Sequence, residues 1–573
     1  MLPDPVRCLL LFPVVTLGLA WPVAAKLKLE PAEKLCATAV LSLLGVYLLA
    51  FASYILGLPN SALWAVPLLA LAGLLAGGRA FREMLGDPDA RALGVGQLLV
   101  SAWCAGWLAL VASYSGGGWA GDWFEHWERA RFFLERWPRE VKFLGRYLLP
   151  ARPPLANLVT GAFLVPAGTT FASYQVIMTL LNGMAFLPAA LLARRFYLSP
   201  GFSPGISPAG GRAVVAALAV LVMVNPSFVE NATFAWTKLI SAFFVLAGLY
   251  FFLRANDADA PAAALPLSAA SLGGGILAHY SAGPYVLLLA AAWVALNFHR
   301  RGEAVFRRRT AQAAGIGAAV LATWFAWAIA NYGIATTLAS NTSATVQPEW
   351  RDHQFLKIML NLRDTLVPHF LRNVDPALIE QRSAWGYLRD WFFQIYQVNL
   401  LFIFGSVAWL ILPVILVREG RRSPARSLRF WSGFVGGAIL LGVIVHGARD
   451  HWGLAHICLL AVVLLGLAYL AARWPGLGRK WKIALAAGAV VDLALGIALQ
   501  FAVQSQALDR WLTPDDPPME QIRSYTESTM INFGAKLVHH LEFFSDVRSV
   551  PGAAVAGFLA VILLLAVVRA SRP

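Results

Sequence analysis

The segment Gly121-Asp122-Trp123-Phe124-Glu125-His126-Trp127-Glu128-Arg129 lies between long apolar stretches and decides how the rest of the chain is interpreted. It belongs to a loop, residues 115–154, that is rich in Trp and Arg and follows the apolar run 93–114. Carboxylates at the boundary between a membrane helix and water are often functional, because burying them in lipid is costly. The segment therefore indicates chemistry at a bilayer surface.

The composition of the 573-residue chain is that of a membrane protein. Hydrophobic residues make up 58% and charged residues 13%, and the mean hydropathy is +0.63, which is too apolar for a soluble globular chain. The net charge of +15 does not indicate nucleic-acid binding, because Lys and Arg form short clusters between apolar runs. The four cysteines lie inside apolar runs and are expected to be core residues: Cys8, Cys36, Cys104 and Cys458.

Apolar runs long enough to cross a bilayer recur along the chain. They predict an all-α polytopic membrane protein with about 13–15 transmembrane helices, juxtamembrane helices and outer-face loops. The runs are 8–25, 35–57, 61–78, 93–114, 173–193, 213–229, 236–253, 265–278, 283–298, 313–330, 398–417, 430–446, 452–472, 483–503 and 550–568. Two of these, 265–278 and 283–298, are half-length and meet near His279. The run 155–168 is expected to be a re-entrant or in-plane helix.

The basic clusters between these runs fall on one side when the runs are counted in this way, and that side is expected to be cytoplasmic. The opposite face then carries the loop 115–154, a short turn at Glu230 and Asn231, the bend at His279, and the segments 331–397, 446–451 and 504–549. The predicted organisation is an N-terminal group of helices at 1–92, a catalytic membrane module at 93–330, an outer-face loop or lid at 331–397, and C-terminal helices at 398–573.

The carboxylates of the loop have two interpretations. Asp122 has the position of a helix N-cap and Glu125 that of its capping-box partner, which would make both structural. Helical spacing also pairs Glu125 with Arg129 and Arg131 with Glu135, as on a solvated helix face. The tryptophans of the loop would then lie in the interfacial belt of a helix that is flat on the outer leaflet. Catalysis by Asp122 is the alternative.

The order of motifs across residues 93–330 resembles the glycosyltransferase C (GT-C) superfamily. The members most similar are the dolichyl-phosphate-mannose protein mannosyltransferase-like enzymes and the bacterial lipid A aminoarabinose transferase type. The residues that carry the resemblance are Asp122-Trp123, Ala130, Arg152-Pro153-Pro154-Leu155, Arg194-Arg195, Asn225-Pro226, Glu230, Trp236-Thr237-Lys238, Gly273-Gly274-Gly275 and His279-Tyr280.

This resemblance implies an inverting transfer of a sugar from a polyprenyl-phosphate donor to a lipid, glycan or protein acceptor. It implies a bacterial inner membrane and an active site on the periplasmic or extracellular face. Asp122 takes the role of general base, which fits the need of an acceptor hydroxyl to lose its proton during attack. Negative charge on the leaving lipid phosphate calls for cations.

Candidate residues for binding the substrate or the lipid phosphate lie near the expected outer face. Lys238 is favoured, because a lysine just inside an apolar helix is costly unless it snorkels to water or finds an anion. His279 follows three glycines at a break where unwound backbone is expected to approach a ligand. The other candidates are Arg152 and Glu230 within the motifs, and Arg449 in the polar turn with His446, Asp450 and His451.

The loop 331–397 is also basic where the positive-inside rule would not place charge, which favours an anionic ligand there. The basic residues concerned are Arg351, His353, Lys357, Arg363, His369, Arg372 and Arg382.

The chain departs from the family pattern in two respects. About three crossings precede the helix that leads into the Asp122 loop, whereas the family usually places that loop after its first helix. The second acidic residue common in mannosyltransferases is replaced by Trp123, which leaves Glu125 as the nearby carboxylate and the second predicted catalytic residue beside Asp122. No cofactor is expected. A divalent metal is possible at Asp122, Glu125 and His126 but unsupported, because adjacent residues of a helix point apart.

Other classes of protein stay open at this stage. A polymerase or ligase of lipid-linked glycans would share the outer active face and would rely on Arg and His of the long loop. A transporter or flippase would use broken helices and charges in the bilayer, as the glycine-rich region before His279 allows. A membrane scaffold would tolerate loss of Asp122 altogether.

Overall fold

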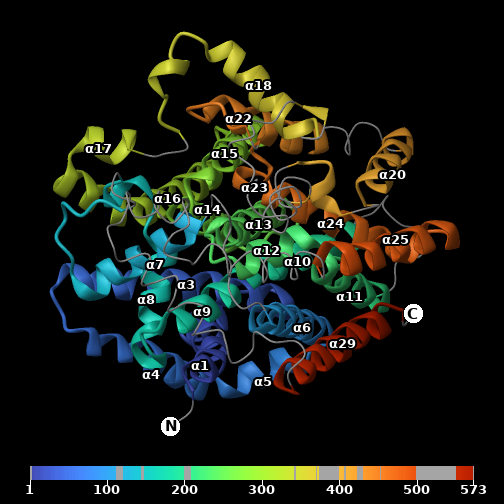
Figure 1. Ribbon diagram of the computed structural model, residues 1–573, viewed down its shortest axis with the longest axis horizontal. Coiled ribbons are helices and arrows are strands. Elements are labelled where there is room, and N and C mark those ends of the chain that lie inside the picture. Colours follow the sequence, from blue (N-terminus) through green and yellow to red (C-terminus); the bar gives the residue numbers. More distant parts are fainter. Residues whose placement is uncertain are drawn as a thin grey trace, which may run out of the picture.

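The computed structural model describes residues 3–110, 120–143, 147–198, 208–340, 344–368, 371–372, 396, 399–405, 408–422, 430–451, 453–497 and 550–571. Within these ranges the chain folds into helices (Figure 1), and an isolated bridge between Phe143 and Tyr147 is its β-type pairing. The predicted all-α class is confirmed.

The N-terminal part of the chain forms a series of consecutive helices. These are α1 (Asp4–Gly18), α2 (Trp21–Ala24), α3 (Pro31–Ile55), η1 (Asn60–Trp64), α4 (Ala65–Ala76), α5 (Gly78–Gly86) and α6 (Pro88–Leu110). Next come α7 (Ala120–Glu135), η3 (Leu149–Ala151), α8 (Leu155–Ala167), α9 (Phe171–Gly183), α10 (Phe186–Leu198), α11 (Pro208–Val224), α12 (Pro226–Thr233) and α13 (Lys238–Ala255).

The second half continues with helices that pack around and beyond this group. They are α14 (Ala264–Ala278), η4 (Tyr280–Ala282), α15 (Gly283–Asn297), η5 (Phe298–Arg300), α16 (Ala304–Tyr332), α17 (Ile334–Ala339), η6 (Pro348–Trp350) and α18 (Gln354–Leu366). The described C-terminal elements are η9 (Phe402–Phe404), α20 (Ala408–Arg422), the π-helical η10 (Trp431–Gly436), α22 (Gly437–Val445), α23 (Ala455–Cys458), α24 (Leu460–Arg473), η11 (Trp474–Gly476), α25 (Arg479–Val491), the π-helical η12 (Asp492–Ile497) and α29 (Val550–Ser571).

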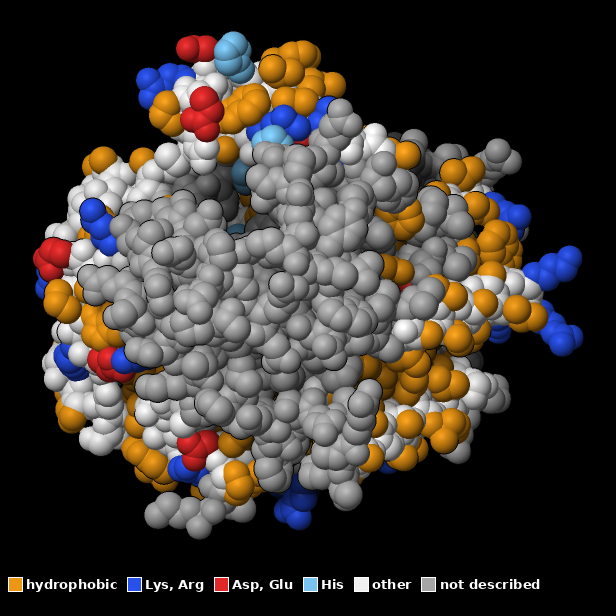
Figure 2. Space-filling view, viewed as in Figure 1, with side chains coloured by type: hydrophobic (Ala, Val, Ile, Leu, Met, Phe, Trp, Pro, Cys, Tyr) orange, Lys and Arg blue, Asp and Glu red, His pale blue; other side chains and the backbone are white. Residues whose placement is uncertain are grey.

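Helix lengths identify the chain as an integral membrane protein. Among the described residues, eight helices are long and apolar enough to span a bilayer, and the number rises to ten if two bent pairs each count as one span. Four shorter apolar helices accompany them, and one of these is α8, at the position of the predicted re-entrant or in-plane helix. Outer helices such as α29 expose Phe558 and Leu564, and hydrophobic side chains gather over α25 and α29 (Figure 2).

Helix α13 lies at the centre of the molecule, surrounded by α10, α14 and α24 (Figure 1). Its residues from Lys238 to Phe252 are all buried. A helix that is apolar on every side is stable only inside a protein or a bilayer. The position of α13 is therefore set by its own sequence, and it brings Lys238 into the interior at its first turn.

Two of the sequence predictions concerned local breaks, and the structure confirms one of them. Helix α14 ends at Ala278 and η4 begins at Tyr280, so the chain breaks at His279 as expected. The three glycines before the break do not unwind, however. They lie inside α14, where an added side chain at Gly273 or Gly274 would meet Val320 or Phe244. Their small size allows close helix packing rather than access by a ligand.

The short turn predicted at Glu230 and Asn231 is wrong, because both residues lie within helix α12. Asn225 caps that helix by accepting a hydrogen bond from the backbone N–H of Phe228 at 2.8 Å, and Pro226 follows as the first helical residue, a position that proline favours. The cysteine prediction is confirmed for the three residues whose side chains are described, since Cys8, Cys36 and Cys104 are buried and unpaired.

Helices α1 and α4 approach one another through glycines. A Cβ atom built on Gly73 would lie 2.4 Å from the carbonyl oxygen of Gly18, and one built on Gly18 would lie 2.3 Å from the carbonyl oxygen of Ala70. Small residues at such crossings allow the backbones of membrane helices to touch. No larger residue fits there unless the helices separate.

Gly73→Ala is therefore expected to destabilise the protein by about 1–3 kcal/mol, because the added methyl group overpacks the crossing. The measurement is unfolding of the purified protein in one detergent. Gly78→Ala is the control, since nothing lies within 4 Å of a Cβ atom there, and it should be neutral or slightly stabilising. Equal stabilities for the two variants would contradict the close crossing.

Candidate active site

A buried ion pair dominates the helix that carries the acidic motif. Arg129 Nη2 lies 2.6 Å from Glu125 Oε1, and both side chains are fully buried. The predicted spacing of this pair is confirmed, but the predicted solvated face is wrong here. The helix packs against α8, which removes this face from water. The second predicted pair, Arg131 with Glu135, forms at 2.7 Å and is partly exposed.

Asp122 lies in the first turn of α7, three residues before Glu125 and four before His126. Because α7 begins at Ala120, Asp122 is inside the helix and is not its N-cap. The capping-box interpretation of Asp122 and Glu125 is therefore wrong, and Glu125 pairs with Arg129 instead. The side chain of Asp122 lies outside the described residues, so its predicted role as a base stays a prediction.

Arg129 also fixes the chain segment that follows α7. Its Nη1 donates to the carbonyl oxygen of Leu149 at 2.6 Å and its Nη2 to that of Leu148 at 3.4 Å. The guanidinium lies 4.2 Å from the ring centroid of Phe143. The Nε of Arg152, three residues after Leu149, lies 3.5 Å from Glu125 Oε2. One carboxylate thus orients two arginines.

The charge state of this pair follows from its surroundings. Burial alone would raise the pKa of Glu125, but Arg129 and Arg152 outweigh it and lower that pKa to about 2. A carboxylate with this pKa stays ionised at neutral pH and is a weak base. The predicted catalytic role of Glu125 stays a prediction. The geometry favours a role in positioning Arg129 and Arg152.

Two neighbouring groups on α7 have perturbed pKa values of their own. Burial lowers the pKa of His126 to about 3, so its imidazole is neutral, and its Nδ1 lies 3.2 Å from Asn157 Oδ1 on α8. Burial and the charge of Glu125 raise the pKa of Glu128 to about 7. Sequence reasoning missed Glu128, because the signal is the environment of the carboxylate and not its spacing.

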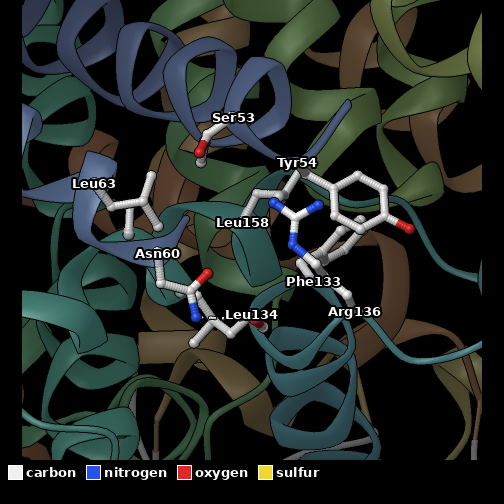
Figure 3. A pocket seen from close by; sticks show the side chains of 11 residues that line it. Ser53, Tyr54, Asn60, Leu63, Phe133, Leu134, Arg136 and Leu158 are labelled. Carbon is white, nitrogen blue, oxygen red and sulfur yellow. Dashed lines mark hydrogen bonds between the residues drawn. The ribbon is translucent and has the colours of Figure 1, made fainter. Parts of the chain in front are cut away.

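The other end of α7 is anchored to the turn before η1 (Figure 3). Asn60 Nδ2 donates to the carbonyl oxygen of Leu134 at 2.9 Å, and the guanidinium of Arg136 donates to the carbonyl oxygen of Leu58. The cavity beside these residues has a volume of about 20 Å³, which suits a water molecule and not a substrate. This contact positions α7 without forming a binding site.

The bend between α14 and η4 meets the same loop from the other side. His279 is 4% exposed, and its Nδ1 lies 2.8 Å from Ser281 Oγ. The hydroxyl of Tyr280 donates to the carbonyl oxygen of Pro150 at 3.1 Å. The segment at Leu148, Leu149 and Pro150 is therefore held by Arg129 of α7 and by Tyr280 of the bend.

Lys238 completes a basic cluster around the bend. It is 8% exposed and its Nζ lies 3.6 Å from the ring centroid of Trp236, so it is buried against an aromatic ring and does not snorkel to water. Burial lowers the pKa of His279 well below its usual value, and the positive charges of Arg152 and Lys238 lower it further. Arg152, Lys238 and His279, predicted from sequence, are thus brought together.

Two other predicted residues lie on other elements, Glu230 on α12 and Arg449 after α22. Glu230 is 1% exposed within α12, which packs on α9. Arg449 pairs with Asp364 of α18, among elements that do not include α7 or α13. Its predicted membership in the same site as Lys238 stays a prediction.

The described residues can also be compared with what a metal site requires. Among them, no group of three His, Cys, Asp or Glu side chains could hold a metal ion. Glu125 and His126 are neighbours on α7. The carboxylate of Glu125 accepts a hydrogen bond from Arg129, and the imidazole of His126 is hydrogen-bonded to Asn157. These two side chains are therefore occupied by protein partners.

Comparison with known proteins finds solved structures that are similar to this chain at low sequence identity. The chain matches no protein-family model, and no curated protein matches it significantly. The crystal structure of ArnT from Cupriavidus metallidurans bound to undecaprenyl phosphate is similar, with 14% sequence identity, a TM-score of 0.44 and coverage of 79% of this chain and 78% of that chain. The apo structure of the same protein gives 15%, 0.43, 82% and 75%.

ArnT is a GT-C lipid A aminoarabinose transferase, which is one of the two types that the motifs of this chain resemble.

Glu125→Gln is expected to destabilise the protein by about 3–5 kcal/mol, because it leaves the Arg129 charge buried without its partner. Glu135→Gln breaks the analogous but exposed pair and should cost less than about 1 kcal/mol. Unfolding of the purified variants in one detergent measures both. A Glu125→Gln protein as stable as Glu135→Gln would show that the buried pair does not hold α7.

Proposed function

We propose that this chain is an inverting glycosyltransferase of the GT-C type, which moves a sugar from a polyprenyl-phosphate donor to a lipid, glycan or protein acceptor at the outer face of a bacterial inner membrane. The observation that carries the proposal is the basic cluster at the bend between α14 and η4, in which Lys238 and His279 are buried and the Arg152 side chain is 16% exposed. It lies beside the loop that joins α7, which carries Asp122, to α8.

The cluster is suited to hold the phosphate of the donor. Lys238 is the first residue of α13, so its ammonium group and the positive end of the helix dipole act on the same region. A lysine at this end opposes the helix dipole, and an anion relieves the conflict. Because the cluster is shielded from water, each charge acts more strongly on the phosphate than it would at the surface.

The chemistry requires one base. The acceptor oxygen attacks the anomeric carbon of the donor sugar, the bond from that carbon to the phosphate oxygen breaks, and the acceptor proton passes to Asp122. A single displacement inverts the anomeric centre. The phosphate leaves as an anion that Arg152 and Lys238 stabilise, so no acid is needed to protonate it.

Glu125 supports this reaction through the arginines. Its ionised carboxylate forms ion pairs with Arg129 and Arg152 at 2.6 and 3.5 Å, so its charge attracts both arginines. Fixed dipoles and charges stabilise a transition state better than mobile ones, because they need no reorganisation during the reaction. Glu125 is in this view a positioning residue.

Asp122→Asn is expected to abolish transfer while leaving donor binding intact. The assay uses the full chain in lipid nanodiscs with a panel of polyprenyl-phosphate sugars, and it follows release of polyprenyl phosphate. Loss of a general base lowers the rate by roughly 100-fold or more. Lys238→Gln should instead weaken binding of undecaprenyl phosphate, measured by native mass spectrometry, by roughly tenfold.

Arg131→Gln is the matched control, since Arg131 lies on the same helix but is partly exposed and pairs with Glu135. It should behave like the unmodified protein in both assays. Normal release by Asp122→Asn would refute Asp122 as the base and would favour a glycan polymerase or ligase that relies on the Arg and His residues of the long loop. No release from any donor by the unmodified chain would refute the transferase.

A further inference from the structure

A second basic cluster surrounds a buried carboxylate on α18, outside the elements of the candidate active site. Asp364 is fully buried, and three arginines contact it. Arg363 Nη2 and Arg372 Nη1 lie 2.7 and 3.0 Å from its Oδ1, and Arg449 Nε lies 3.2 Å from its Oδ2. Arg449 comes from the turn after α22, so the cluster joins segments that are about 85 residues apart in sequence.

Hydrogen bonds connect α18 to the segment that carries Arg449. Asn361 bridges α18 to the turn, since its Nδ2 donates to the carbonyl oxygen of Ala448 at 2.9 Å and its Oδ1 accepts from the N–H of Asp450 at 2.8 Å. The N–H of Leu454 donates to Thr365 Oγ1 at 3.0 Å. Gly453 has a φ of +85°, and a Cβ atom there would lie 2.6 Å from the carbonyl oxygen of Asp364. The arginines are therefore held in place before any ligand arrives.

The charges of the cluster do not balance. Among the described residues, three guanidinium groups form ion pairs with this carboxylate, which leaves an excess of two positive charges over it. The side chain of Arg372 is 5% exposed, and in the part of the chain that the structure describes its Nε and Nη2 have no hydrogen-bond partner. Unmet donors of a buried cation are costly.

The pKa of Arg372 reflects this excess. Burial lowers that pKa, Asp364 acts in the opposite direction, and the charges of Arg363 and Arg449 lower it further. Asp364 therefore offsets only part of the cost of burying the Arg372 guanidinium group, and a further anion beside it would stabilise its positive charge.

We propose that the Asp364 cluster binds a phosphate group. A phosphate monoester carries close to two negative charges at neutral pH, which matches the excess, and guanidinium groups bind its oxygens through paired N–H donors. The phosphate can be part of a lipid headgroup or free in solution. Helix α18 lies at the edge of the molecule beside α22 (Figure 1), where charged side chains of both signs gather (Figure 2).

Binding of two probes tests this site in the full chain. Inorganic phosphate is titrated into the protein in detergent, and dioleoyl phosphatidic acid is compared with dioleoyl phosphatidylcholine in nanodiscs. Binding of both phosphate probes would support a site for phosphate from any source, and binding of phosphatidic acid alone would support a headgroup site. Arg372→Gln and Arg449→Gln should raise the dissociation constant by roughly tenfold or more.

Arg351→Gln is the matched control, because Arg351 is an exposed arginine just before α18, and it should change the dissociation constant by less than about twofold. If Arg372→Gln does not fold, Arg363→Gln takes its place, since that side chain is 44% exposed. Equal binding by all variants, or no binding of either probe by the unmodified chain, would overturn the proposal. Because the readout is binding, an Asp122→Asn protein serves equally well, which separates this test from that of the transferase.

Discussion

The buried salt bridge between Glu125 and Arg129 is the interaction on which the candidate active site depends. It holds a full positive charge inside the protein, and that charge then binds the backbone carbonyl groups of Leu148 and Leu149. These carbonyl groups lead directly to Arg152, which contacts the same carboxylate. The helix that carries Asp122 and the loop that carries the cations are thereby fixed relative to one another.

The ion-pair groups around Glu125 and around Asp364 share one principle of construction. In each, a fully buried carboxylate orients several cations that come from different elements: Glu125 with Arg129 and Arg152, and Asp364 with its three arginines. A carboxylate in the interior lowers the cost of bringing these cations together. It leaves part of their charge uncompensated, which is the condition for attracting a phosphate.

Sequence patterns predicted what depends on neighbours along the chain. Apolar runs predicted the helices and the break at His279, and they placed the start of α13 within two residues of Lys238, because the cost of polar groups in a bilayer is local. The solvated face of α7, the capping box at Asp122 and the turn at Glu230 were wrong, because burial by α8 and helix extension depend on distant segments. The contact between Asp364 and Arg449 could not be predicted from the sequence for the same reason.

The contact between Lys238 and Trp236 has a consequence for how this membrane protein is made. The aromatic partner precedes the lysine by two residues, so the two emerge together during synthesis, whereas Arg152 and His279 are far from Lys238 in the sequence. The ammonium group can therefore rest on an indole face as α13 enters the bilayer. Insertion of the central helix does not have to wait for the rest of the chain to assemble around it.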